Sequence, residues 1–197
     1  EDTEGGCDIY KATLKDEEII EVSRLEGNLN SHEWDSQPSI SCDGTKMFFS
    51  STRKDGLGGG DIYLSSLMPN GDWGIASNLG PNLNTKGDEE APFIANDGKT
   101  LYFASNSHVG MGGLDLFKTT WAQDGTWSVP ENLGYPINDH RDNFGLVVSP
   151  DGATGYLTGG TLSIPSEYMG RKNPQIYFFK MPPSIMPEKS SWLEIWA

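Results

Sequence analysis

The stretch GGLDLFKTTW, residues 112–121, has two related copies earlier in the chain. They are GGCDIYKATL at residues 5–14 and GGGDIYLSSL at residues 58–67, so the copies start at Gly5, Gly58 and Gly112. Two further sets of markers recur at the same interval: the dipeptides Asp43-Gly44, Asp97-Gly98 and Asp151-Gly152, and the asparagines Asn30, Asn84 and Asn138. Self-similarity at a fixed period is the signature of a repeat architecture, here with a period of about 54 residues.

Each period divides into four short extended segments separated by turn residues. In the middle copy the first three segments are residues 91–95, 100–105 and 114–120, and the fourth starts at Trp127. The Asp97-Gly98 turn joins the first two segments, because Asp-Gly supplies the positive φ that a tight hairpin requires. Four strands in a period of this length are typical of a β-propeller blade.

The sequence therefore predicts an all-β fold, an arc of about three and a half four-stranded blades. Helical solenoids require long stretches of 3.6-residue periodicity, which glycine and proline interrupt throughout this chain. A β-sandwich remains an alternative, although a sandwich has no reason to repeat its turns at a constant period. We expect the blades to occupy residues 1–182, with residues 183–197 forming a C-terminal extension or the start of a following module.

An arc of this size leaves strand edges unpaired, because propellers close with about four to eight blades. The missing strands then come from a longer native chain or, as an alternative, from closure of two copies into one ring. The chain begins at Glu1, which suggests a processed product or a fragment. Residues 191–197, SWLEIWA, alternate well enough to form one more strand.

Composition excludes several classes of function. The 197 residues include 14 Lys and Arg against 28 Asp and Glu, and the resulting formal charge of −14 repels nucleic acid and anionic lipid. The longest apolar runs fall far short of the roughly 20 residues that a membrane helix needs. Cys7 and Cys42 show no metal-ligand spacing and are too few for a disulfide framework.

Three longer motifs carry a resemblance to a known family. They are WSVPENLGYPIN at residues 127–138, DGKTLYFAS at residues 97–105 and GMGGLDLF at residues 110–117. Over residues 5–181 the chain resembles the propeller repeats of outer-membrane and periplasmic proteins of Bacteroidetes-type bacteria. These repeats are related to the TolB propeller and are often joined to an OmpA-like peptidoglycan-binding domain. Some such proteins are similar to lipoprotein subunits of the type IX secretion and gliding machinery.

The resemblance implies a location in the periplasm or at the outer membrane, partners among envelope proteins or another subunit that completes the propeller, and a complex linked to peptidoglycan. The chain departs from the family pattern in its last repeat, where residues 172–175 replace the G-G-x-D motif. The loop before Ile176 is also longer, since Ile176 lies farther along the chain from its counterpart Leu116 than Leu116 lies from Ile62. That departure puts the loop geometry of the last blade in question.

Candidate binding residues lie in loops that a propeller brings to one face. These are the loops before the first strand of each blade and those between its second and third strands. An aromatic anchor and a set of acids mark this face as a candidate partner-binding surface: Trp34, Asp35, Asp88, Glu89, Glu90, His140 and Asp142. The alternative interpretation is that these acids are only solvated and that Trp34 packs on its neighbours.

Other polar residues have structural explanations. Asp8, Asp61 and Asp115 precede the third segment without the spacing of a calcium loop, so we expect them to accept backbone hydrogen bonds. His32 and His140 have no evident Ser or Cys partner for a hydrolytic triad. Sialidase repeats carry an S-x-D-x-G-x-T-W turn, which QDGTW at residues 123–127 does not match.

These observations predict a non-catalytic interaction scaffold of a bacterial envelope assembly, without catalytic residues, cofactor or metal. The rigid blades of a propeller hold variable loops on one face, so that little binding energy goes into ordering the scaffold. The alternative is a glycan-binding or glycan-processing propeller, since propeller glycosidases use paired carboxylates and this face carries acids beside a tryptophan.

Overall fold

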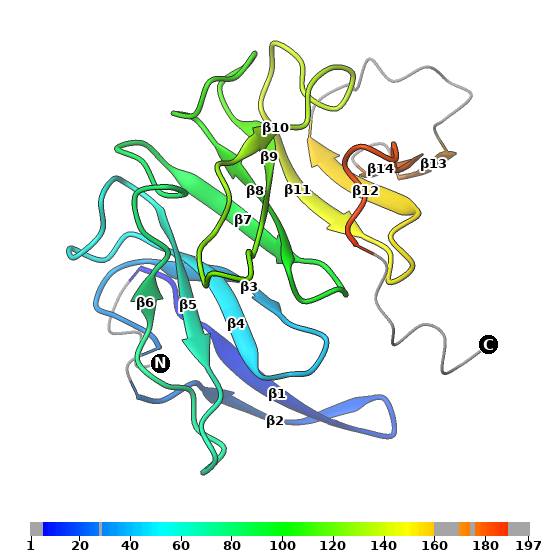
Figure 1. Ribbon diagram of the computed structural model, residues 1–197. Helices are drawn as coiled ribbons and strands as arrows, with labels where there is room; N and C mark the ends of the chain where they lie inside the picture. Colours follow the sequence, from blue (N-terminus) through cyan, green and yellow to red (C-terminus); the bar gives the residue numbers. More distant parts are fainter. Residues whose placement is uncertain (1–5, 28, 160–169, 174–175, 189–197) are drawn as a thin grey trace.

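The computed structural model describes residues 6–27, 29–159, 170–173 and 176–188 of the chain. Every regular element in this part is a β-strand, and the strands form one two-stranded and three four-stranded antiparallel sheets (Figure 1). The structure thus confirms the predicted all-β arc of three and a half blades. The two-stranded sheet is called the half blade, and the others are called the first, second and third blades in chain order. No helix in the described part could span a membrane.

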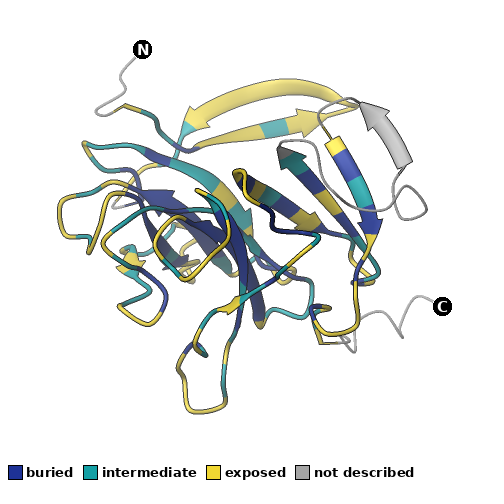
Figure 2. Cartoon of the chain, turned by 90° about the horizontal axis from the view of Figure 1, so that it is seen from above, coloured by how far each residue is buried: buried dark blue, intermediate teal, exposed yellow. Residues whose placement is uncertain are grey.

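The half blade is the hairpin of β1 (Tyr10–Lys15) and β2 (Glu18–Arg24). These strands correspond to the third and fourth segments of a repeat, as the sequence predicts. Nearly every residue of the hairpin is exposed, in contrast to the buried strands of the blades that follow (Figure 2). The exposure follows from the absence of inner strands beside β1 in the described residues.

The first and second blades share one design. Their strands are β3 (Asp35–Ile40), β4 (Lys46–Ser51), β5 (Asp61–Ser66) and β6 (Ser77–Asn78), then β7 (Glu89–Ile94), β8 (Thr100–Ser105), β9 (Asp115–Thr120) and β10 (Glu131–Asn132). The second strand is almost wholly buried in both blades, because neighbouring blades cover its two faces. Apolar and aromatic residues on both faces suit such a strand.

The third blade differs from the expected repeat at its outer edge. It comprises β11 (Asn143–Val148), β12 (Thr154–Gly159), β13 (Gly170–Asn173) and β14 (Ile176–Lys180), in the spatial order β11-β12-β14-β13. The sequence predicts three strands here and a longer loop before the third. In the structure that longer segment supplies an outer strand, with Gly170 opposite Phe178 and Arg171 opposite Tyr177. The predicted strand at 191–197 lies outside the described residues.

Each inner strand contains a bulge at the same place. The pairing register shifts between Ser36 and Ser39, and again at the equivalent positions in β7 and β11. The bulged residues Gln37, Ala91 and Gly145 occupy equivalent positions in successive repeats and have φ of 54°, 49° and 69°. A bulge bends its strand and increases the local twist. Here it also links blades, since the Ala91 amide donates to Gln37 Oε1 at 2.8 Å.

Asparagine side chains extend the outer edge of the blades. Asn84 accepts a hydrogen bond from the Ile62 amide and donates to the Ile62 carbonyl oxygen, each at 2.9 Å. Asn138 bonds both main-chain groups of Leu116 in the same way, at 2.8 Å each. These asparagines therefore satisfy the strand amides that the two-residue outer strands leave unpaired, and they add a second hydrogen bond to carbonyl oxygens that already accept the Leu79 and Leu133 amides.

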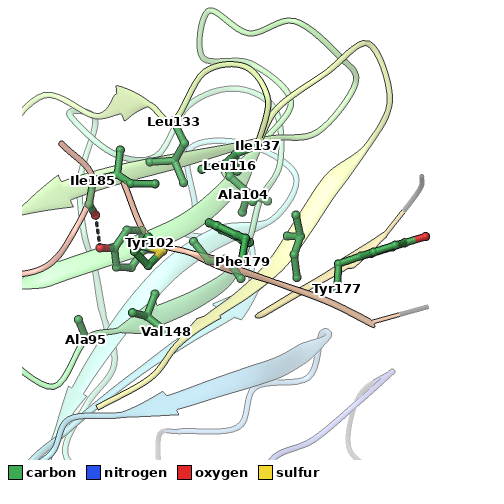
Figure 3. Packing of buried hydrophobic residues seen from close by; sticks show 13 residues of the cluster. Ala95, Tyr102, Ala104, Leu116, Leu133, Ile137, Val148, Tyr177, Phe179 and Ile185 are labelled. Atoms are coloured by element: carbon green, nitrogen blue, oxygen red, sulfur yellow. Dashed lines mark hydrogen bonds between the residues drawn. The ribbon is translucent and has the colours of Figure 1, made fainter. Parts of the chain in front are cut away.

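The apolar core lies between successive blades. Five buried residues lie between the half blade and the first blade, eight between the first and second, and 13 between the second and third. In the last of these clusters the segment after β14 turns back over the sheet, and Ile185 packs beside Leu133 and Tyr102 (Figure 3). The Tyr102 hydroxyl donates to the Ile185 carbonyl oxygen.

Candidate functional site

Two sets of loops meet at one end of the sheets. Strand pairing brings Asp35 opposite Ser51 and Ser51 opposite Asp61, so the loops that lead into the first strand and into the third strand of a blade emerge together. The same arrangement recurs at Glu89, Ser105 and Asp115 in the second blade. We call this end the loop face, defined by residues 29–35, 52–60, 83–90, 106–114 and 137–142.

Buried acids organise the loop face from beneath. Asp35 and Glu89 are both 0% exposed and occupy equivalent positions at the start of β3 and β7. Glu89 Oε2 accepts the Thr85 amide at 2.7 Å, and Oε1 accepts the hydroxyls of Thr85 and Ser105. Asp35 accepts the hydroxyl and amide of Ser31 in the same manner. Each acid thereby fixes the loop that precedes it.

This burial corrects part of the sequence-based expectation. The sequence predicts Asp35 and Glu89 as partner-binding residues, but neither carboxylate reaches the surface. The sequence contains a signal for their structural role, since Ser31 and Thr85 stand at the same spacing before each acid and the third blade has Asn143 at the equivalent position. Asn143 likewise accepts the Asp139 amide at 3.0 Å.

A basic side chain acts on each of these two acids: Arg53 on Asp35 and His108 on Glu89. Arg53 donates to Asp35 Oδ1 and to the Leu29 carbonyl oxygen, both at 2.7 Å, and its guanidinium lies 4.7 Å from the centre of the Tyr63 ring. In the second blade His108 Nε2 lies 2.7 Å from the Leu83 carbonyl oxygen. The His108 ring also packs against Phe103 and Phe117. No local sequence signal indicates either role.

The two acids have opposite pKa shifts. Burial acts to raise the pKa of Asp35, but hydrogen bonds from Ser31, Ser51 and Arg53 outweigh that effect and hold the pKa below its ordinary value. Burial raises the pKa of Glu89 above its ordinary value, although hydrogen bonds from Ser105 and Thr85 and the charge of His108 oppose it. Hydrogen bonds therefore outweigh burial at Asp35, where Arg53 donates in addition to the two serines, whereas burial outweighs them at Glu89.

Asp88 and Asp142 join neighbouring blades. Asp88 Oδ1 accepts the Gly60 amide at 3.0 Å, while its Oδ2 accepts the Asn106 amide group at 2.7 Å. Asp142 Oδ1 accepts the Leu114 amide at 3.0 Å. The residue before each donor is a glycine, and a Cβ on Gly59 would lie 2.2 Å from Asp88 Oδ1, so a larger residue there would displace the carboxylate. These carboxylates therefore have a structural role at the surface.

Trp34, Glu90 and His140 are the remaining predicted residues. Trp34 is partly exposed and lies where Asp88 and Asp142 stand in later repeats, and its indole faces Gly6 of the half blade. Glu90 is partly exposed on the inner strand β7, and His140 is exposed in the loop before β11. Within the described residues the side chains of Glu90 and His140 form no hydrogen bond or ion pair. Asp88 is also partly exposed and Asp142 is exposed, but their carboxylates accept main-chain amides, so Trp34, Glu90 and His140 are the accessible predicted residues whose side chains do not hold a loop.

The recurrent aspartates before the third strand bind loop amides. Asp115 Oδ2 accepts the amides of Met111 and Gly112 at 2.6 and 2.9 Å, and Asp61 Oδ2 accepts the Leu57 amide and the side-chain amide of Asn78. Asp8 instead pairs with Arg24 at 2.8 Å. Among the described residues no group of three or more His, Cys, Asp or Glu side chains could hold a metal ion.

Comparison with known proteins supports the fold. No protein-family model and no curated protein sequence matches the chain. The chain is similar to the crystal structure of TolB from Acinetobacter baumannii, with a TM-score of 0.51 and 20% identity, covering 80% of this chain and 33% of that one. It is also similar to the structure of a putative TolB from Agrobacterium tumefaciens, with a TM-score of 0.52 and 16% identity, covering 81% and 49%.

A luciferin-regenerating enzyme also matches, with a TM-score of 0.48 and 12% identity, covering 86% of this chain and 51% of that one. The similarity to the two TolB structures shows a TolB-like β-propeller fold. The chain spans between a third and a half of the length of those TolB structures.

Proposed function

We propose that the chain is a non-catalytic protein-interaction propeller of the bacterial periplasm or outer membrane, and that it binds its partner through the loop face. The observation that carries this proposal is the contrast between fixed loops and accessible side chains. Buried Asp35 and Glu89 hold the loops, while Trp34, Glu90 and His140 remain available at the surface. A pre-organised surface with an aromatic anchor is typical of protein-binding sites.

The fold and the sequence motifs support the envelope location. TolB-like structures are solved relatives of this fold, and the motifs at residues 97–105, 110–117 and 127–138 resemble repeats of envelope proteins. The resemblance extends the proposal to a role as a scaffold in an outer-membrane assembly linked to peptidoglycan. The net charge of −14 favours a partner surface with basic residues.

The use of the acids supports a role without catalysis. Paired carboxylates act as acid and base only when both can reach a substrate. Asp35 and Glu89 are buried beneath the loops, and Asp88 and Asp142 accept main-chain amides of neighbouring blades. Glu90 is the one predicted acid on this face whose carboxylate makes no hydrogen bond within the described residues.

Site-specific photocrosslinking tests this proposal. A photoreactive amino acid replaces His140 on the loop face, and a matched control replaces Asp124, which is exposed in the β9–β10 turn at the opposite end of the second blade. In the bacterium that produces the chain, we expect one dominant protein adduct from position 140 and none from position 124. Trp34→Ala should reduce this adduct at least tenfold.

Two results would contradict the proposal. Equal adducts from positions 140 and 124 would show that the loop face has no preferred partner. Saturable binding of a defined glycan that Trp34→Ala or Glu90→Gln abolishes, without any protein adduct, would instead establish the glycan-binding alternative.

A further inference from the structure

The half blade has an open strand edge. In every complete blade the third strand pairs on one side with the second strand and on the other with an outer strand. β1 corresponds to that third strand, but among the described residues it pairs with β2 alone. An unpaired edge carries main-chain donors and acceptors that can accept a further strand.

The register shows which groups lie on the open edge. The Leu25 amide donates to the Ile9 carbonyl oxygen at 3.1 Å, and Tyr10 lies opposite Arg24. Because bonded and non-bonded pairs alternate in an antiparallel ladder, the main-chain groups of Tyr10 and Ala12 point away from β2. The equivalent Tyr63 pairs with Phe49 of β4.

A groove adjoins this edge. It has a volume of about 1220 Å³ and lies between the half blade and the first blade, lined by residues including Tyr10, Ala12, Ile40, Met47, Trp73 and Ile75. Ile40 is 52% exposed, whereas its counterpart Ile94 is 4% exposed. Trp73 is partly exposed, whereas its counterpart Trp127 is buried.

The next interface shows what the groove lacks. There Phe48 of β4 projects from the first blade and packs edge-on against Trp127, with ring centroids 5.8 Å apart, in the cluster that also buries Ile94. β4 is the second strand of its blade, and the half blade has no second strand among the described residues. An aromatic residue from such a strand would cover Trp73 and Ile40 in the same way.

We propose that the open edge of β1 and this groove bind an antiparallel β-strand of the repeat's own second-strand type, whose aromatic side chain enters the groove. β4 and β8 show the required pattern, KMFFSS and TLYFAS: the aromatic residue that faces the next blade, Phe48 or Tyr102, lies opposite the equivalent of position 11, and serine lies opposite the equivalent of position 8. The occupant in this proposal is a propeller strand of this type that does not belong to the described residues. A second copy of this chain has no free strand of this type in its described part, because β4, β8 and β12 are each paired on both edges.

The exposed hairpin agrees with a surface that is covered in the assembled protein. Leu14, Ile19, Ile20 and Val22 are between 58% and 65% exposed. Exposed apolar residues on a sheet edge favour an interaction site, and strand addition to such an edge combines main-chain hydrogen bonds with side-chain pockets. This surface is separate from the loop face, so its test is independent of the proposed function.

A peptide that supplies the missing strands tests the proposal. The probe is a synthetic peptide of residues 89–105, which contains the first and second strands of the second blade. Hydrogen exchange of the full chain is measured with increasing probe. We expect saturable slowing of exchange at the amides of Tyr10 and Ala12, with little change in β9. Absence of slowing at saturating probe would overturn the proposal.

Matched proline variants locate the binding edge. Ala12→Pro removes an amide from the open edge without removing a hydrogen bond to β2, and Val22→Pro removes one from the outer edge of β2. We expect Ala12→Pro to weaken probe binding at least tenfold and Val22→Pro to leave it within twofold. Equal weakening by both would overturn the proposal.

Chemical changes to the probe keep the test independent of the variants' folding. A probe with an N-methylated Phe103 amide cannot donate to the edge opposite Tyr10, and a probe with Tyr102→Thr cannot fill the groove. Both should bind at least tenfold more weakly. Equal binding by a scrambled peptide would show a non-specific apolar surface and overturn the proposal. Self-association of the chain that Ala12→Pro abolishes would show that a second copy occupies the edge, and would also overturn it.

Discussion

Arg53 and Asp35 form an ion pair of 2.7 Å beneath the loop face, with the carboxylate side chain 0% and the guanidinium side chain 12% exposed. The pair joins the loop after β4 to the start of β3, and Arg53 reaches the preceding loop through the Leu29 carbonyl oxygen. The loop face is therefore stabilised by a charge pair that lies beneath its accessible side chains.

Loss of the cation should destabilise the fold strongly. Arg53→Met leaves the Asp35 carboxylate buried without its partner, which costs about 3–5 kcal/mol in comparable sites. Urea unfolding of the full chain measures this change. Lys54→Met is the matched control, because Lys54 pairs with Glu33 at 3.2 Å but is 91% exposed, and its loss should cost no more than about 1 kcal/mol. Equal effects would contradict the structural role of the buried pair.

Glu89 should make the stability depend on pH in a defined direction. Burial raises the pKa of Glu89 in the folded state. Its contribution to the free energy of unfolding is therefore fully present below the unfolded-state pKa of 4.5 and is lost as pH rises through the raised folded-state pKa. Relative to wild type, Glu89→Gln should therefore become more stable as pH rises from 4 to 8. Urea unfolding at several pH values measures this difference.

Asp35→Asn provides the control of opposite sign. The pKa of Asp35 is lowered in the folded state, so its contribution is present above the unfolded value of 3.8 and is lost as pH falls through the lowered value. The stability difference between wild type and Asp35→Asn should thus shrink as the solution becomes more acidic, because the wild type loses the contribution of the ionised carboxylate. The same slope for both variants would show that the two acids do not differ as described.

Asn84 should tolerate no change that removes its amide donor. Asn84→Asp replaces the group that donates to the Ile62 and Asn78 oxygens with a carboxylate oxygen, so both hydrogen bonds are lost and a carboxylate is buried beside two acceptors that keep only the Leu79 and Gly80 amides. The lost hydrogen bonds and the buried carboxylate together should lower the free energy of unfolding by about 1–3 kcal/mol. Asn82→Asp, at a nearby exposed position, should change it by less than about 0.5 kcal/mol.

Equivalent isoleucines should respond differently to truncation. Ile94→Ala removes a buried side chain from the cluster between the first and second blades and should cost about 2–5 kcal/mol. Ile40→Ala, at the half-exposed counterpart, should cost about 0.5 kcal/mol or less. Urea unfolding measures both. Similar costs would show that Ile40 is covered in solution.

Much of the fold follows from local signals in the sequence. Asp-Gly turns require positive φ, and Gly44, Gly98 and Gly152 adopt it at 71°, 67° and 72°. Aromatic second strands such as Thr100–Ser105 predict burial on both faces, which the structure confirms. These features are predictable because turn geometry and strand burial depend on residues close together in the chain.

The remaining features depend on contacts between repeats. Glu89 and Glu90 are adjacent acids, yet one is buried and the other partly exposed, because strand alternation turns them to opposite faces. The outer strand Gly170–Asn173 replaces the fourth strand of the last blade, and no turn signal or apolar alternation predicts it. Ile185 packs in the last interface, where the preceding interface has Trp127, through a turn with no repeat motif.

The most direct test of the proposed function is a hydrogen-exchange footprint of the chain bound to the protein that crosslinks at position 140. We predict slowed exchange in residues 29–35, 83–90 and 137–142, with no change at the Asp43-Gly44, Asp97-Gly98 and Asp151-Gly152 turns at the opposite end. Slowed exchange at those turns, with the loop face unchanged, would contradict the proposed function.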